Sequence, residues 1–230
     1  MSTMDPDFVI NSLQLLASLI GAALAIVIGW IVWNKDRKYL LNRCFALGLV
    51  CIGVGSFFFG LGSVLLEMAA LTTQIFITLT AGAFLFLLIV AITLNSGVVA
   101  AERTRNMVMY AGLFIIAMIA IWAPGSVYLV GPGNIEMSTQ FMMIIYPMAG
   151  GVFAAIIYQF TRVYWKATNK KAKKTAGFFL LGLVTLAGAL VISLLSNVLQ
   201  NRWFDLLGTL AMSLGIAFMG WGFREPAKDE

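Results

Sequence analysis

The stretch FVINSLQLLASLIGAALAIVIGWIVWNKDRK, residues 8–38, decides the fold class of this chain. It carries no charged side chain before Lys35, where the basic segment begins. About 20 apolar residues, at about 1.5 Å of rise each, suffice to cross the hydrocarbon core of a bilayer as one helix. Basic residues directly after such a run are typical of the cytoplasmic edge of a membrane span. We therefore predict a membrane-spanning helix that ends in the cytoplasm.

The composition of the whole chain extends this prediction. The 230 residues are 61% hydrophobic and 11% charged, whereas an ordinary globular domain is about 25% charged. A soluble core of this size could not enclose so much apolar surface, so the bilayer is the expected solvent. We predict one all-α domain over residues 1–230, a polytopic bundle of seven transmembrane helices. The expected spans are 8–33, 43–65, 72–96, 107–123, 140–161, 176–199 and 203–222.

The basic residues predict the orientation of the bundle. Every Lys and Arg except Arg202 falls after the first, third or fifth span or in the C-terminal segment. Loops rich in Lys and Arg stay in the cytoplasm. We therefore expect the N-terminus outside, the C-terminus in the cytoplasm, and a multi-pass protein of the cell membrane. This orientation accounts for the net charge of +5 without nucleic-acid binding.

Several kinds of chemistry are missing from the sequence. It contains no histidine, which excludes His-ligated haem, the usual zinc and copper sites and His-based acid–base catalysis. A retinal Schiff base needs a lysine within a helix, and every lysine lies outside the predicted spans. No charged residue lies near the middle of a span, where ion-coupled pumps keep such groups. We expect that the chain is not an enzyme and that it binds no metal, haem, retinal or other cofactor.

Polar side chains within the spans gather at the predicted outer ends. Because polar groups that face lipid are unfavourable, we expect these side chains to turn inward and line a ligand-binding outer cup between the first, second, third, sixth and seventh spans. The alternative is the ordinary polarity of helix ends that meet water and headgroups. The candidate residues are Asn11, Gln14, Glu67, Gln74, Asn197, Asn201 and Asp205.

The densest positive charge follows the fifth span. Near anionic lipid each such cation contributes about 1 kcal/mol of attraction. We expect a cytoplasmic surface here that docks on lipid or on a partner. Its residues are Lys170, Lys171, Lys173 and Lys174.

Small residues recur four apart along several spans, a spacing that lets helix backbones approach closely. We expect most of these stripes to pack within the bundle, with packing against a second subunit as the alternative. A glycine-dense segment of the second span is likewise expected to be a close-packing face. The stripes are Gly21–Ala25–Gly29, Gly150–Ala154, Gly151–Ala155 and Ala211–Gly215, and the dense segment holds Gly53, Gly55, Gly60 and Gly62.

The order of these features resembles a known family. The quoted segments are NKDRKYLLNRCFALGLVCIGVGSFFFGLGSVLLE (34–67), GFFLLGLVTLAGALVISLLSNVL (177–199) and NRWFDLLGTLAMSLGIAFMGWGF (201–223). They resemble the seven-helix membrane sensor modules of some prokaryotic histidine kinases. Those kinases continue into a coiled coil and catalytic domains, whereas this sequence stops shortly after Arg224. The resemblance implies a sensor-like module that acts through a separate protein or has a structural role, and it assigns no catalytic residue.

The predicted function is a non-enzymatic, sensor-like or accessory membrane module. It would act in the bilayer through a partner membrane protein or as a homo-oligomer. The alternative is a small-solute or lipid transporter, or a channel, that has no ion-coupling carboxylates. A transporter needs a polar path across the midplane, so a bundle centre closed by Leu, Ile and Phe would argue against it.

Overall fold

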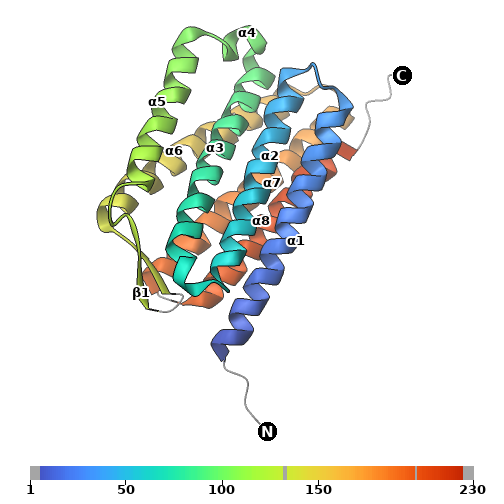
Figure 1. The fold of residues 1–230 in the computed structure, drawn as a ribbon. Helices are drawn as coiled ribbons and strands as arrows, with labels where there is room; N and C mark the ends of the chain where they lie inside the picture. Colours follow the sequence, from blue (N-terminus) through green and yellow to red (C-terminus); the bar gives the residue numbers. More distant parts are fainter. Residues whose placement is uncertain (1–5, 132–133, 200, 225–230) are drawn as a thin grey trace.

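The computed structural model describes residues 6–131, 134–199 and 201–224 as an all-α bundle (Figure 1). Within that part of the chain, seven helices are long and apolar enough to cross a membrane. They are α1 (Pro6–Lys35), α2 (Leu40–Gly62), α3 (Ala69–Ser96), α5 (Thr104–Ile121), α6 (Thr139–Lys166), α7 (Lys170–Leu199) and α8 (Arg202–Arg224). The shorter elements are η1 (Leu66–Met68), α4 (Val98–Ala101), β1 (Val127–Gly131) and β2 (Asn134–Met137). The predicted all-α fold with seven candidate spans is confirmed, and the chain is a multi-pass membrane protein.

Consecutive spanning helices run in opposite directions (Figure 1). The start of α1 and the strands lie at one end of the bundle, which we call the hairpin end. The end of α1, α4 and the end of α8 lie at the other, which we call the basic end because Lys35, Lys166 and Lys170 lie there. Trp30 and Trp221 at the basic end, and Trp203 at the hairpin end, are more than half exposed, as in the aromatic belts of membrane proteins.

Most of the helices extend beyond the apolar runs that predicted them, whereas α2 ends at Gly62 and α5 at Ile121, short of the predicted residues 65 and 123. The largest difference is in α7, which begins at Lys170 and not at residue 176. The side chain of Asn169 accepts a hydrogen bond from the backbone N–H of Lys171, at 2.8 Å, as a helix cap does. Hydropathy marks the buried part of a helix, so it does not detect the turns that continue into the polar boundary of the bilayer.

The connection between α5 and α6 contains a β-hairpin that the hydropathy pattern did not indicate. Strands β1 and β2 pair antiparallel, with Tyr128 opposite Glu136. The Tyr128 hydroxyl donates to the Glu136 carboxylate at 3.1 Å, which raises the pKa of the Tyr128 phenol. A two-stranded hairpin is marginal by itself. A backbone hydrogen bond from Ser138 to Ser126 at 2.9 Å closes its base.

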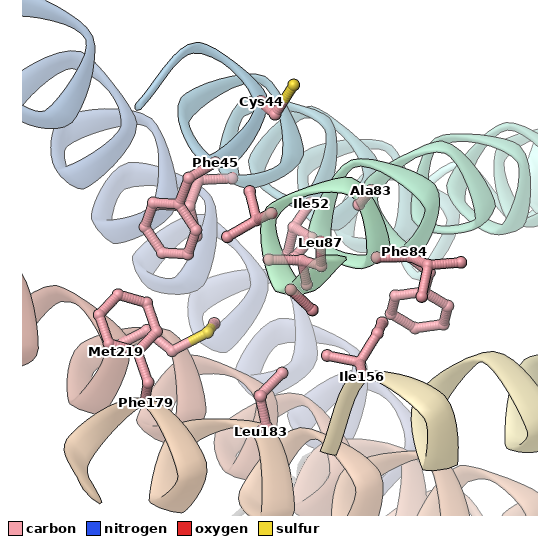
Figure 2. Close-up of a cluster of buried hydrophobic side chains, with 14 of the residues drawn as sticks. Cys44, Phe45, Ile52, Ala83, Phe84, Leu87, Ile156, Phe179, Leu183 and Met219 are labelled. Atoms are coloured by element: carbon pink, nitrogen blue, oxygen red, sulfur yellow. The ribbon is translucent and has the colours of Figure 1, made fainter. Parts of the chain in front are cut away.

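Aromatic side chains fill the half of the bundle nearer the basic end. The Phe179 ring lies 5.2 Å from the Phe45 ring, edge to face, and is stacked on the Phe160 ring at 5.6 Å. Figure 2 shows Phe45 and Phe179 facing each other, with Met219 beside them and Leu87 of α3 across the core. We call Phe45, Phe160 and Phe179 the aromatic plug, because they join α2, α6 and α7.

Glycines allow α1, α2, α7 and α8 to pack at close range. A Cβ added at Gly60 of α2 would lie 2.7 Å from Cβ of Ser18 in α1. A Cβ added at Gly182 of α7 would lie 2.6 Å from the carbonyl oxygen of Gly215 in α8. The stripes on α1 and α8 and the glycines of α2 therefore pack within the bundle, as predicted.

The small-residue stripes on α6 do not pack within the bundle. Gly150, Gly151, Ala154 and Ala155 are exposed, and a Cβ added at either glycine would meet nothing within 4 Å. The expectation of packing inside the bundle is wrong for these residues. The spacing that predicts a smooth helix face does not specify what covers that face.

We predict that Gly182→Ala lowers the free energy of unfolding by roughly 1–3 kcal/mol, because the new methyl group overpacks the α7–α8 contact. The matched control is Gly150→Ala, which adds the same methyl group in open space and is expected to change stability by less than about 1 kcal/mol. The measurement is unfolding by SDS in mixed micelles. Equal effects of the two substitutions would contradict the close α7–α8 contact.

Candidate functional site

A partly open cavity of about 260 Å³ lies in the half of the bundle nearer the hairpin end. All seven spanning helices and strand β2 contribute side chains to its wall. Small-molecule sites commonly measure roughly 300–1,000 Å³. The cavity is thus slightly smaller than that range and suits a small ligand.

The floor of the cavity is apolar. Ile52 of α2, Phe84 of α3 and Leu186 of α7 line the cavity and also belong to the main hydrophobic core. The Phe84 ring meets the Phe153 ring edge to face, at 4.5 Å. Below this layer lies the aromatic plug. The cavity therefore ends against packed side chains.

Aromatic and aliphatic side chains also form most of the side wall. They come from helices on every side of the cavity, so an occupant would meet hydrocarbon in all directions at this depth. The larger members are Phe59, Phe76, Phe114, Phe141, Ile145, Met148, Leu190 and Met212.

One corner of the cavity is polar, where α1 meets α8. The Gln14 side-chain amide donates from Nε2 to the Thr209 hydroxyl at 2.6 Å. The Thr209 hydroxyl in turn donates to the backbone carbonyl of Asp205 at 2.9 Å. Since the single hydroxyl hydrogen of Thr209 is used in this way, Thr209 must accept from Gln14, and this fixes the orientation of the amide. The other amide atom, Oε1, is enclosed and has no hydrogen-bond partner among the described residues.

Charged and amide groups surround this corner at the mouth of the cavity. Arg202 donates from Nη1 to the side-chain oxygen of Asn11 at 3.3 Å, which joins α8 to α1. The Asp205 carboxyl group lies beside the Ser196 hydroxyl and within the electrostatic influence of Arg202. Arg202 therefore places its positive charge near the Asp205 carboxyl group. We call Asn11, Gln14, Arg202, Asp205 and Thr209 the polar corner.

The structure brings together part of the predicted outer cup. Asn11, Gln14, Asn201 and Asp205 line the cavity. Asn197 belongs to α7, but its side chain lies outside the described residues. The convergence of α1 with α8 is thus as expected, and ligand binding there stays a prediction.

Two predicted residues lie elsewhere. Glu67 is exposed in η1 and is not part of the cavity wall. Gln74 donates to the Ile121 carbonyl at 3.1 Å and to the Ser126 hydroxyl at 3.2 Å. The last carbonyl groups of a helix have no partner within that helix, so Gln74 ties α3 to the end of α5 instead of facing the cavity.

Other residues of the wall were not singled out from the sequence. Thr80, Ser193, Ser196 and Thr209 line the cavity, and the Thr80 hydroxyl has no hydrogen-bond partner among the described residues. An isolated Ser or Thr in an apolar span usually bonds to its own helix, so no sequence pattern distinguished these four residues.

The predicted docking lysines lie at the basic end, far along α7 from the cavity. Lys173 places its ammonium group 5.1 Å from the centre of the Tyr164 ring and 5.8 Å from that of Trp165, within the range of a cation–π contact. Lysines in the first turn of a helix oppose its macrodipole. Proximity to anionic headgroups would offset this cost.

No family model matches this chain, and the comparison with curated proteins also gives no match. The fold and the cavity therefore define its class by themselves. It is a multi-pass, all-α membrane protein with an apolar, closed-ended cavity that has one polar corner.

We predict that a thiol introduced by Thr80→Cys reacts with a small water-soluble methanethiosulfonate, because Thr80 is partly exposed and lines the partly open cavity, even though its own hydroxyl oxygen is enclosed. The control is Ser18→Cys. Ser18 is buried in the α1–α2 contact and its hydroxyl also lacks a partner, so neither change removes a hydrogen bond. In a background with Cys44→Ala and Cys51→Ala, position 80 should react about tenfold faster or more, since exposure governs thiol reactivity. Equal rates at the two positions would contradict an accessible cavity.

Proposed function

We propose that this chain is a non-enzymatic, sensor-like membrane module that binds a small ligand in the cavity and acts through a partner membrane protein or a second copy of itself. One observation carries the proposal. The cavity has a polar corner at its mouth and ends against an apolar floor and the aromatic plug. A cavity closed at its floor is better suited to binding a ligand than to letting a solute cross the membrane.

Helix α8 connects the cavity with the basic end of the bundle, and we propose that it transmits the signal. Its first turns carry Asp205 and Thr209 at the cavity, and further along the same unbroken helix Gly215 and Met219 pack tightly against α7. A ligand that changes the position of the first turns would move a rigid element that reaches the basic end. This arrangement is consistent with the resemblance to kinase sensor modules, whose output domains follow the last helix.

We propose further that the hairpin end faces outward and the basic end faces the cytoplasm of a cell membrane. Lys35, Arg103, Lys166 and Lys170 lie at or beside helix ends on the same side of the bundle. Positively charged segments of this kind remain on the cytoplasmic side. The ligand would then enter from outside the cell.

The alternative function is a transporter or channel. It would require the aromatic plug to open, and the plug joins three helices through ring contacts between fully or nearly fully buried side chains. The described wall of the cavity also offers only apolar side chains at its floor. These observations favour the sensor-like module.

The orientation is tested with single thiols in the background without native cysteines. Val130→Cys lies on the hairpin and Lys170→Cys at the start of α7, and both positions are exposed. A membrane-impermeant maleimide applied to intact cells should label position 130 alone, and lysis should make position 170 reactive. The reverse pattern would place the cavity on the cytoplasmic side and contradict the proposal.

The choice between binding and transport is tested in reconstituted membranes. We expect no K⁺ or Cl⁻ conductance in planar bilayers and no glycerol flux into proteoliposomes above protein-free controls. Ala81 lines the cavity, so Ala81→Phe would place a large side chain in it. A flux that this substitution abolishes would instead establish the transporter.

The coupling to a partner is tested in native membranes. Chemical crosslinking followed by purification in mild detergent should yield the chain joined to a second membrane protein or to another copy of itself. A monomer with no crosslinked neighbour would contradict action through a partner.

A further inference from the structure

We infer that the cavity takes a neutral amphiphile of about ten non-hydrogen atoms, with a hydrogen-bond-donating head at the polar corner and a hydrocarbon tail on the apolar floor; this inference rests on the proposed function as a ligand-binding module. The size follows from comparison with an engineered cavity of about 150 Å³ that takes the six carbons of benzene. The cavity here measures about 260 Å³. A primary alcohol such as 1-nonanol has the required size and polarity.

The charge of the head follows from the groups at the mouth. Asp205 and Arg202 act on each other, and Glu136 accepts a hydrogen bond from Tyr128 at the cavity rim. A head of either charge would meet a group of like charge at this mouth, and it would also lose its hydration in a cavity whose wall is mostly apolar. A neutral head avoids both costs.

The donor character of the head follows from Gln14. Its Nε2 is committed to Thr209, and its Oε1 is a buried acceptor without a partner among the described residues. A buried acceptor that lacks a hydrogen bond is unfavourable. Gln14 is 5% exposed and lines the cavity, so a hydroxyl group that enters the polar corner would supply the donor that this oxygen lacks.

The length of the tail follows from the floor. Ile52, Phe84 and Leu186 belong at once to the cavity wall and to the packed core, so the cavity cannot lengthen without disrupting the core. Affinity should rise roughly fourfold for each added methylene that is buried. It should stop rising near nine carbons, where the floor is reached. Partition into detergent or lipid shows no such limit over this range.

The experiment uses the full chain carrying Thr80→Cys in the background without native cysteines. Protection of the thiol from methanethiosulfonate is measured against n-alkanols of four to fourteen carbons. We expect protection to strengthen up to about nine carbons and then level off. Val152→Phe adds bulk to the cavity wall, so protection should level off at a shorter alkanol. If protection keeps strengthening up to fourteen carbons, or if Val152→Phe does not change the chain length at which it levels off, the assigned position of the tail is wrong.

The head is tested with compounds of matched length. 1-Nonanol should protect more strongly than octyl methyl ether, which lacks a donor, and more strongly than nonanoate or nonylammonium. Gln14→Met should remove the preference for the alcohol over the ether. Thr209→Val is the matched control, because it removes the same Gln14–Thr209 hydrogen bond but keeps the Gln14 oxygen, and it should retain the preference.

The outcomes separate this inference from the proposed function. If position 80 is labelled but no alkanol protects it, the ligand class is wrong and the cavity stands. Loss of the preference in Thr209→Val as well as in Gln14→Met would assign it to the fold of the corner and overturn the role of the Gln14 oxygen. If position 80 is not labelled at all, both the ligand class and the proposed binding function fail.

Discussion

The whole structure depends on the absence of water from the hydrocarbon core of a bilayer. Backbone N–H and C=O groups there must pair within the chain, so each crossing segment becomes a helix. Where the chain leaves that core, other structure appears, as in the β-hairpin between α5 and α6. The same constraint turns polar side chains toward each other. Gln14, Thr209, Asn11 and Arg202 join α1 to α8, helices from opposite ends of the sequence.

The cavity arises from unequal packing around the bundle. On one side, Gly60 and Gly182 bring α1, α2, α7 and α8 to close backbone contact. On the other side, Gly150 and Gly151 of α6 face outward and draw no neighbour close. Since van der Waals packing is a principal source of helix association in lipid, these glycine contacts hold the four helices closely together. The helices beside them leave space between bulky side chains such as Phe114 and Met148.

The two halves of the bundle differ in what they can do. Near the basic end, the aromatic plug and its aliphatic neighbours fill the interior. Near the hairpin end, the interior is hollow and carries the polar corner. A ligand in the hollow half would press on α8, which is held against α7 in the filled half. This combination of a hollow half and a tightly packed helix pair supports the proposed sensor-like function, which requires no catalytic group.

The sequence by itself determined the solvent of the protein and the number of spans, because these depend on local composition and on about 20-residue lengths. It also indicated Gln14 and Asp205 as groups that need partners. Only the tertiary structure decided which residues are their hydrogen-bond partners. Gln14 meets Thr209, 195 residues away, whereas Gln74, equally polar, caps the end of α5. Hydropathy is a property of one helix at a time, whereas a cavity lies between helices. Its shape depends on how closely each pair of helices packs.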